Sequence, residues 1–184
     1  MHHDELWYPG RKYPTSLIMR INRTIDFLDE VWFPILDIGE DNPMKREFEK
    51  RIQALIDSTD AKLDFDYDRI PGKYKTIYCF EVIEHLFNPL FFLESLKLAM
   101  DDNGIIYLST VRNGCTGLRW YYRHYYEIPD KQIRWLFDRA GLEIVKTKRI
   151  RFHEHFWELW NGGIGLRPLL KYFNSTRLYK LRKK

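Results

Sequence analysis

Four short apolar runs, rich in β-branched and aromatic residues, recur along this chain, and a helix-type pattern separates each run from the next. The runs span residues 35–38, 76–82, 105–110 and 142–147. Strands that alternate with helices are typical of βαβ units, which align their strands in parallel and cover both faces of the sheet. We therefore predict an α/β fold built on a doubly wound, mostly parallel sheet.

The helix-type segments carry local signals for where a helix begins or ends. The expected helices begin at Thr15-Ser16, Pro43, Pro89 and Pro129. The second has an apolar stripe formed by Met44, Phe48, Ile52 and Leu55. Asp41 or Asn42 can cap that helix, and Gly141 stands where a helix C-cap is needed. These signals support the alternation of strands and helices independently of the strand patterns.

The predicted topology also indicates where a ligand would bind. In doubly wound sheets, ligands bind at the carboxyl ends of the strands, where the strand order reverses. The first strand ends at Gly39 and the next strong one at Val82. We therefore expect the mouth of the site near residues 39–42 and 80–85.

Basic side chains are concentrated at the C-terminal end of the chain. Residues 146–184 hold eleven of the 30 Lys and Arg residues but only two of the 26 Asp and Glu residues. Such a segment can contact anionic lipid or a negatively charged substrate, or it can form a solvated, frayed end. No nucleic-acid-binding motif accompanies it, so we do not expect nucleic acid as a partner.

Cysteine content and hydropathy exclude several classes of protein. The two cysteines, Cys79 and Cys115, are too few for a disulfide framework or a four-thiolate zinc site. No apolar run approaches the roughly 20 residues that a membrane-spanning helix needs, and the first ten residues lack a secretory signal. We expect a cytoplasmic protein.

Four segments, taken in order, resemble a known family. They are Ile35 to Gly39, Cys79 to Leu86 with Asn88-Pro89, Gly104 to Thr110 with Asn113, and His124 to Tyr126 with Lys131 to Val145. Their order and spacing are similar to those of the class I S-adenosylmethionine-dependent methyltransferases, especially the branch that acts on small molecules and glycans. The resemblance covers residues 15–150, about three quarters of the chain.

The resemblance implies a Rossmann-like domain over residues 1–184, with its core at 15–150 and a basic, aromatic C-terminal segment at 151–184. It also implies S-adenosylmethionine as methyl donor and S-adenosylhomocysteine as product. The cofactor-binding residues expected from it are Asp37, Gly39, Glu40, Asp57, Asp64, Phe80 and Glu81. Asp57 lies at the spacing of a ribose-binding acid, and either Asp64 or Asp66 resembles the acid that meets the adenine amino group.

The chain departs from the family in two places. The family's first turn usually reads G-x-G-x-G, whereas this chain has Gly39-Glu-Asp-Asn-Pro43, with one glycine. Only 36 residues separate Gly39 from Thr76, too few for the family's complete strand, helix and strand. We therefore expect an abbreviated sheet with one helix missing. We also find no clear final strand after residue 150, which predicts a second abbreviation at that edge.

Methyl transfer needs proximity and in-line orientation above all, and a general base helps when the acceptor is a hydroxyl group. His85 follows the 76–82 strand at the expected mouth, so it is our candidate base; the alternative is a local structural role. His153-Glu154-His155 lacks a third ligand at a defined spacing. We therefore expect no metal site.

Taken together, these features predict an S-adenosylmethionine-dependent methyltransferase that acts on a small molecule or a glycan. The single glycine and the shortened acidic segment favour an alternative, a catalytically inactive relative that serves as a binding or scaffolding protein. A third hypothesis is a peripheral protein whose basic, aromatic C-terminal segment binds anionic lipid or RNA, with or without catalysis. The oligomeric state is open at this level.

Overall fold

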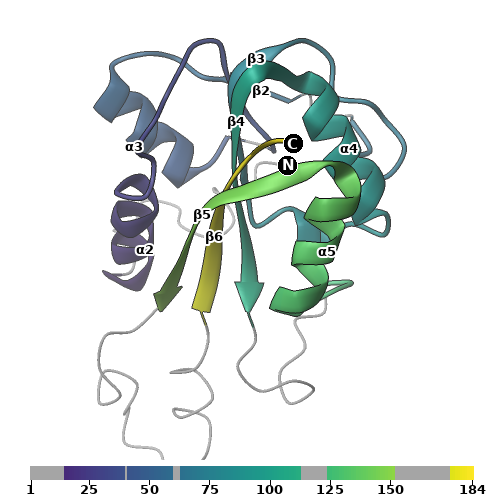
Figure 1. Cartoon of the computed structure of the whole chain (residues 1–184). Helices are drawn as coiled ribbons and strands as arrows, with labels where there is room; N and C mark the ends of the chain where they lie inside the picture. Colours follow the sequence, from purple (N-terminus) through teal and green to yellow (C-terminus); the bar gives the residue numbers. More distant parts are fainter. Residues whose placement is uncertain (1–14, 40, 60–62, 113–123, 152–174) are drawn as a thin grey trace, which may run out of the picture.

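The computed structural model describes residues 15–39, 41–59, 63–112, 124–151 and 175–184, and it contains one mixed sheet (Figure 1). The strands are β1 (Ile35–Asp37), β2 (Asp57–Ser58), β3 (Tyr74–Phe80), β4 (Met100–Arg112), β5 (Leu142–Arg151) and β6 (Ser175–Lys183). Their order is β2-β1-β3-β4-β6-β5, and only β6 runs antiparallel to its neighbours. The mostly parallel α/β sheet expected from the sequence is confirmed.

Helices cover both faces of this sheet (Figure 1). They are α2 (Thr15–Ile25), α3 (Pro43–Ile52), α4 (Pro89–Ala99) and α5 (Asp130–Ala140), with a 3-10 turn η1 (Ile83–His85) after β3. Asn42 is the residue that caps α3, because its side chain accepts the N–H groups of Met44 and Lys45. Gly141, at φ 75°, ends α5 as expected. In the described part of the chain, no helix is long and apolar enough to cross a bilayer.

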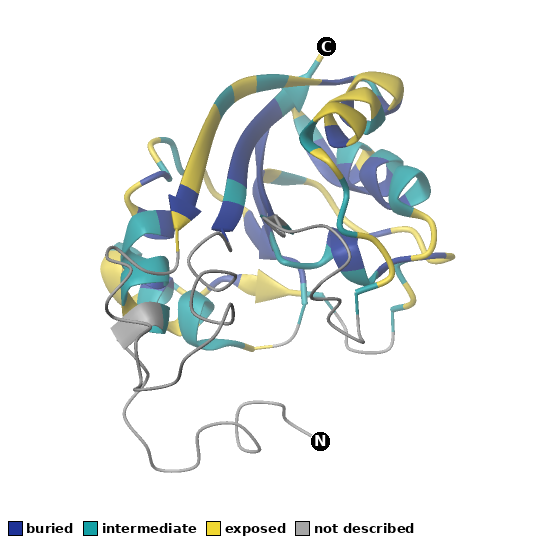
Figure 2. Cartoon of the chain, turned by 90° about the horizontal axis from the view of Figure 1, so that it is seen from below, coloured by how far each residue is buried: buried dark blue, intermediate teal, exposed yellow. Residues whose placement is uncertain are grey.

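Two apolar cores lie on the two faces of the sheet. Along β3, Ile77 and Cys79 pack with α4 and α5, whereas Tyr78 between them packs with α2 and α3. This alternation follows from the two-residue period of a strand. The central strands are accordingly buried on both sides, while exposed residues lie mainly on the helices and at the sheet edge (Figure 2).

The C-terminal strand overturns two expectations. Residues 175–183 form β6, which inserts between β4 and β5, so the core does not end at residue 150 and the end of the chain is not frayed. Leu178 and Leu181 are buried, one in each core. The basic side chains of residues 175–184 all pair with acids of the same molecule, namely Arg177, Lys180, Arg182, Lys183 and Lys184. The charge expected to face a membrane is therefore neutralised internally in this part.

The abbreviation expected between the first two motif strands is confirmed. Among the residues described between α3 and β3, only the two-residue β2 is regular structure. One local expectation is wrong. Leu55 is 87% exposed rather than part of the α3 stripe, because Gln53 turns left-handed and ends the helix. The strand expected at 105–110 is longer than predicted, since β4 begins at Met100 and its register with β3 shifts near that end.

Candidate functional site

A cavity of about 320 Å³ lies at the carboxyl ends of β1 and β3. The strand order reverses between these two strands, so the cavity occupies the position at which such sheets bind ligands. Figure 2 views the molecule from the side at which the parallel strands end. The cavity wall consists of Leu17, Arg20, Ile21, Thr24, Asp37, Ile38, Asn42, Pro43, Met44, Phe80, Glu81, Ser109 and Thr176. Its volume is typical of a small-molecule site, about 300–1,000 Å³.

Asp37, the last residue of β1, places a carboxyl group in the cavity wall. The residue is 4% exposed, and its Oδ2 accepts a hydrogen bond of 3.2 Å from the Asn42 side chain. Burial disfavours the charged form and raises the pKa of Asp37 to about 7. A cationic ligand in the cavity would favour the carboxylate, so proton release and cation binding are coupled at this residue.

Glu81 directs a second carboxylate into the cavity from the end of β3. Its backbone is left-handed, with φ 57°, and its N–H donates to the carbonyl and hydroxyl oxygens of Ser109. Its carboxylate accepts hydrogen bonds of 2.7 and 2.9 Å from Arg20 Nη1 and one of 2.9 Å from the Thr176 hydroxyl. A left-handed non-glycine residue costs of order 1 kcal/mol or more and is often found at functional sites.

The turn after β1 stays open although it has a single glycine. Gly39 has φ 122°, and its N–H donates to the Thr59 hydroxyl at 2.9 Å. An added Cβ at Gly39 would meet no atom within 4 Å, so the protein leaves free space beside this backbone. Asp41 pairs with Arg46 at 2.7 Å on the surface of α3 and does not line the cavity.

The remaining acids expected at the cofactor lie elsewhere. Asp57 is an exposed residue of the edge strand β2, and Asp64 is exposed and accepts the N–H of Asp66. The Asp66 carboxylate is buried and accepts the N–H groups of Phe87 and Asn88. None of the three lines the cavity, whereas Phe80 does. Glu40 and the histidines of 153–155 lie outside the described residues.

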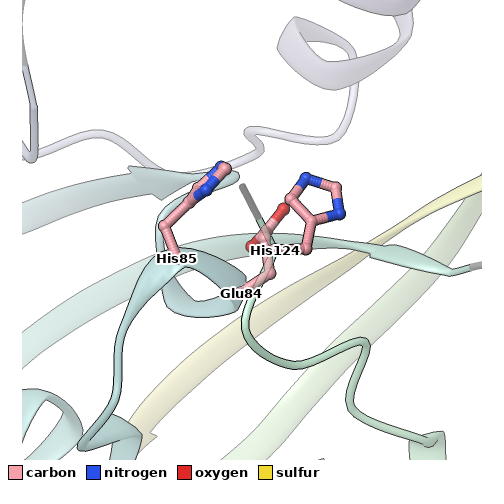
Figure 3. A group of neighbouring side chains, drawn as sticks. All are labelled: Glu84, His85 and His124. Atoms are coloured by element: carbon pink, nitrogen blue, oxygen red, sulfur yellow. The ribbon is translucent and has the colours of Figure 1, made fainter. Parts of the chain in front are cut away.

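His85 does not line the cavity; it belongs to a second group of polar side chains, which begins at Glu84, three residues after Glu81 in the chain. The group comprises Glu84, His85 and His124, whose side chains gather in one place although they come from η1 and from the segment before α5 (Figure 3). The rings of His85 and His124 are 4.8 Å apart, centroid to centroid. Glu84 is fully buried, and burial, followed by the nearby charge of Glu81, raises its pKa to about 8.

Sequence reasoning missed Arg20, Thr176 and His124 as members of these sites. Arg20 lies on α2 beside the apolar residues that face the core, so its guanidinium can reach the cavity. This position in the helix was the one sequence feature that could have identified it. Thr176 belongs to β6, which the sequence did not reveal. His124 entered the sequence analysis only through the fourth segment that resembles the family, and nothing local indicated that it meets His85.

A family model described as a methyltransferase domain matches residues 3–147 of this chain. The match covers well over half of the sequence and includes Asp37, at the end of β1, and Glu81, directly after β3. A search among curated proteins finds no match.

Solved structures share the fold at low sequence identity. An O-methyltransferase from a polyketide multienzyme of Brevibacillus brevis, in complex with S-adenosylhomocysteine, is 16% identical (TM-score 0.59, covering 100% of this chain and 80% of that one). A phosphoethanolamine N-methyltransferase of Haemonchus contortus is 12% identical, with a TM-score of 0.65, and the match covers 89% of this chain and 52% of that one. A [4+2]-cyclase is also 12% identical, with a TM-score of 0.58, and the match covers 89% of this chain and 81% of that one. By its family match and its fold, the chain belongs to the class I S-adenosylmethionine-dependent methyltransferases.

Proposed function

We propose that the protein binds S-adenosylmethionine in the cavity at the ends of β1 and β3 and transfers its methyl group to a small-molecule acceptor. The observation that carries this proposal is the cavity itself. It lies at the reversal point of a methyltransferase-domain sheet, with Asp37 and the Arg20–Glu81 pair in its wall.

The charges of the wall complement those of the cofactor. S-adenosylmethionine carries an ammonium group, a sulfonium group and a carboxylate. Asp37 and Glu81 offer carboxylates to the two cationic groups, and Arg20 offers a guanidinium to the carboxylate. Because Glu81 is already paired with Arg20 at 2.7 Å, the pair is oriented before the cofactor arrives.

A small-molecule acceptor is supported by the neighbours. The Haemonchus contortus enzyme was crystallised with phosphomonomethylethanolamine, and the Brevibacillus brevis enzyme is an O-methyltransferase of a polyketide assembly. A glycan acceptor and a cytoplasmic location remain predictions from the sequence. For a hydroxyl acceptor, His85 is the proposed general base, because it ends η1, the turn that begins two residues after the cavity-lining Glu81.

The cofactor proposal is tested by calorimetric titration of the folded protein with S-adenosylmethionine and S-adenosylhomocysteine. We expect micromolar binding by the wild-type protein. Gly39→Ala should weaken it at least tenfold, because the added methyl group would fill space that the cofactor approaches. Gly141→Ala is the control, since it also places a side chain at a positive φ, 75°, but at the end of α5, away from the cavity, where the flexible end of Lys97 can give way.

The outcomes separate the two candidate functions. A loss of stability in both variants with a loss of binding only in Gly39→Ala supports the enzyme. If wild-type protein shows neither heat nor thermal stabilisation at millimolar cofactor, the catalytically inactive binding or scaffolding protein is the better description.

A further inference from the structure

We propose that Glu84, His85 and His124 form a binding site for a divalent transition-metal ion, with Zn²⁺ as the best-matched ion. In the part of the chain that the structure describes, this is a group of three potential ligands whose donor atoms all lie within 4.8 Å of one another (Figure 3). Around a tetrahedral ion with bonds of about 2.1 Å, donors lie roughly 3.4 Å apart. Small side-chain rotations would therefore bring the three donors to coordinating distance.

The backbone holds the two halves of this site together. The N–H groups of Tyr125 and Tyr126 donate to the carbonyl oxygen of Glu84, at 2.9 and 3.2 Å. These bonds place His124 beside Glu84 and His85, although His124 is distant from both in the sequence. The arrangement does not depend on the ion, so the site is organised before an ion binds.

Outer contacts orient two of the three ligands. His124 Nδ1 lies 3.5 Å from Glu127 Oε1, a contact that fixes the orientation of the ring. Glu84 Oε2 accepts the Thr110 hydroxyl at 3.1 Å, and Oε1 accepts the Val111 N–H at 3.4 Å. Each carboxylate oxygen has a further lone pair for coordination. Carboxylate–histidine contacts of this kind are the usual second layer of a metal site.

The ligand types select the class of ion. Two imidazoles and one carboxylate suit Zn²⁺ and related transition metals, whereas Mg²⁺ and Ca²⁺ prefer sites made of oxygen atoms. Three protein ligands leave at least one coordination position open. Resting on the proposed methyl transfer, we infer that this position takes the acceptor's oxygen and lowers the pKa of its hydroxyl group, whose proton passes to water, a role that metal ions serve in other enzymes. With an ion bound, the metal replaces His85 as the group that activates the hydroxyl, because a coordinating ring nitrogen cannot accept a proton.

The test is a titration of untagged, chelator-treated protein with Co²⁺, whose visible ligand-field bands report coordination by protein side chains, followed by competition with Zn²⁺. We expect one ion per chain at this site. His85→Asn and His124→Asn should each weaken binding at least tenfold, and Glu127→Gln should weaken it by about tenfold through His124. Glu94→Gln, on the exposed side of α4, is the carboxylate control and should not change it.

The histidine variants carry the test because Glu84 is fully buried and its replacement can disturb folding. Thermal melting of the metal-free variants verifies that they are folded. Co²⁺ affinity that stays unchanged in both histidine variants, or no binding by folded wild-type protein, overturns the proposal. Titration of the metal-free protein with S-adenosylmethionine is run alongside, so that failure of the metal site and failure of the cofactor site are distinguishable.

Discussion

Asp37 has opposite effects on stability and on ligand binding. Its carboxyl group is buried at the end of β1, and the raised pKa of about 7 means that folding favours its protonated form. For an acid with a raised pKa, stability is greatest at low pH and falls as pH rises from the unfolded pKa, near 4, through the folded one. The same carboxylate is the group that a cationic cofactor needs.

We therefore expect Asp37→Asn to raise the melting temperature at pH 8, by about 4 °C or more, and to change it much less at pH 5. The amide keeps the shape of the side chain and can still accept from Asn42. Affinity for S-adenosylmethionine should fall at least tenfold in calorimetry at pH 8. Asp41→Asn, in an exposed pair with Arg46, is the control and should change neither property appreciably. Equal thermal shifts of Asp37→Asn at both pH values would contradict the assignment.

At the scale of elements, β6 is held in the sheet by lysines in two different environments. Lys180 is 2% exposed, and its Nζ lies 2.7 Å from both Asp29 Oδ1 and Glu30 Oε1. Lys183 pairs at 2.8 Å with Asp102, whose side chain is 95% exposed. The Lys180 ammonium is buried, but the side chains of Asp29 and Glu30 are 41% and 36% exposed, so this cluster lies between a buried ion pair, which is costly to break, and an exposed one, which contributes little.

Lys180→Met should lower the free energy of unfolding by about 1 kcal/mol, because Asp29 and Glu30 lose a buried ammonium but stay partly exposed and keep Lys146 and Arg182 as partners. Lys183→Met should lower it by less than about 0.5 kcal/mol. Urea unfolding of both variants measures the difference, and equal losses would show that burial of the Lys180 ammonium is unimportant. Deleting residues 177–184 cannot test whether the basic C-terminal segment binds an anionic partner, because the deletion removes most of β6, the strand between β4 and β5.

At the scale of the whole molecule, we expect the stability of the fold to decrease on both the acid and the alkaline side of an optimum pH. Asp37 and Glu84, with pKa values raised to about 7 and about 8 by burial, are destabilising once ionised. For Asp29, burial favours a higher pKa, but hydrogen bonds from Lys146 and Lys180 outweigh this effect and hold the pKa well below its ordinary value. The hydrogen bond from Lys180 lowers the pKa of Glu30. These two acids contribute stability above a pH of about 4, and this contribution is lost as pH falls further.

We therefore expect the melting temperature to be highest near pH 5, to fall in stronger acid, and to decline gradually toward about pH 8. Differential scanning fluorimetry across this range measures the profile. Asp37→Asn should flatten the upper limb and leave the acid limb unchanged. A maximum above pH 8 would mean that the two buried carboxyls do not control the alkaline limb.

Local sequence signals were sufficient for most elements and for the edge of the sheet at which the cavity lies. The Asn42 cap, the C-terminal Gly141 and the alternating pattern of β3 act over a few residues, so the chain alone reports them. They also explain why Asp37, Phe80 and Glu81, which directly follow or end strands, line the cavity. Asp57 was selected by its spacing and Asp64 by its resemblance to the family's pattern, both in a segment that is shortened, and neither residue lines the cavity.

The sequence by itself determined the α/β class, the missing helix and the family, because periodicity, caps and motif order are properties of neighbouring residues. Only the tertiary structure decided that β6 joins the sheet. A lysine at a buried strand position breaks the apolar pattern by which a strand is predicted. Lys180 can be buried there because it donates hydrogen bonds to Asp29 and Glu30, about 150 residues away in the chain. It also decided that Arg20 meets Glu81 and that His124 meets His85. Such contacts depend on how strands and helices pack across the sheet, which no local pattern encodes.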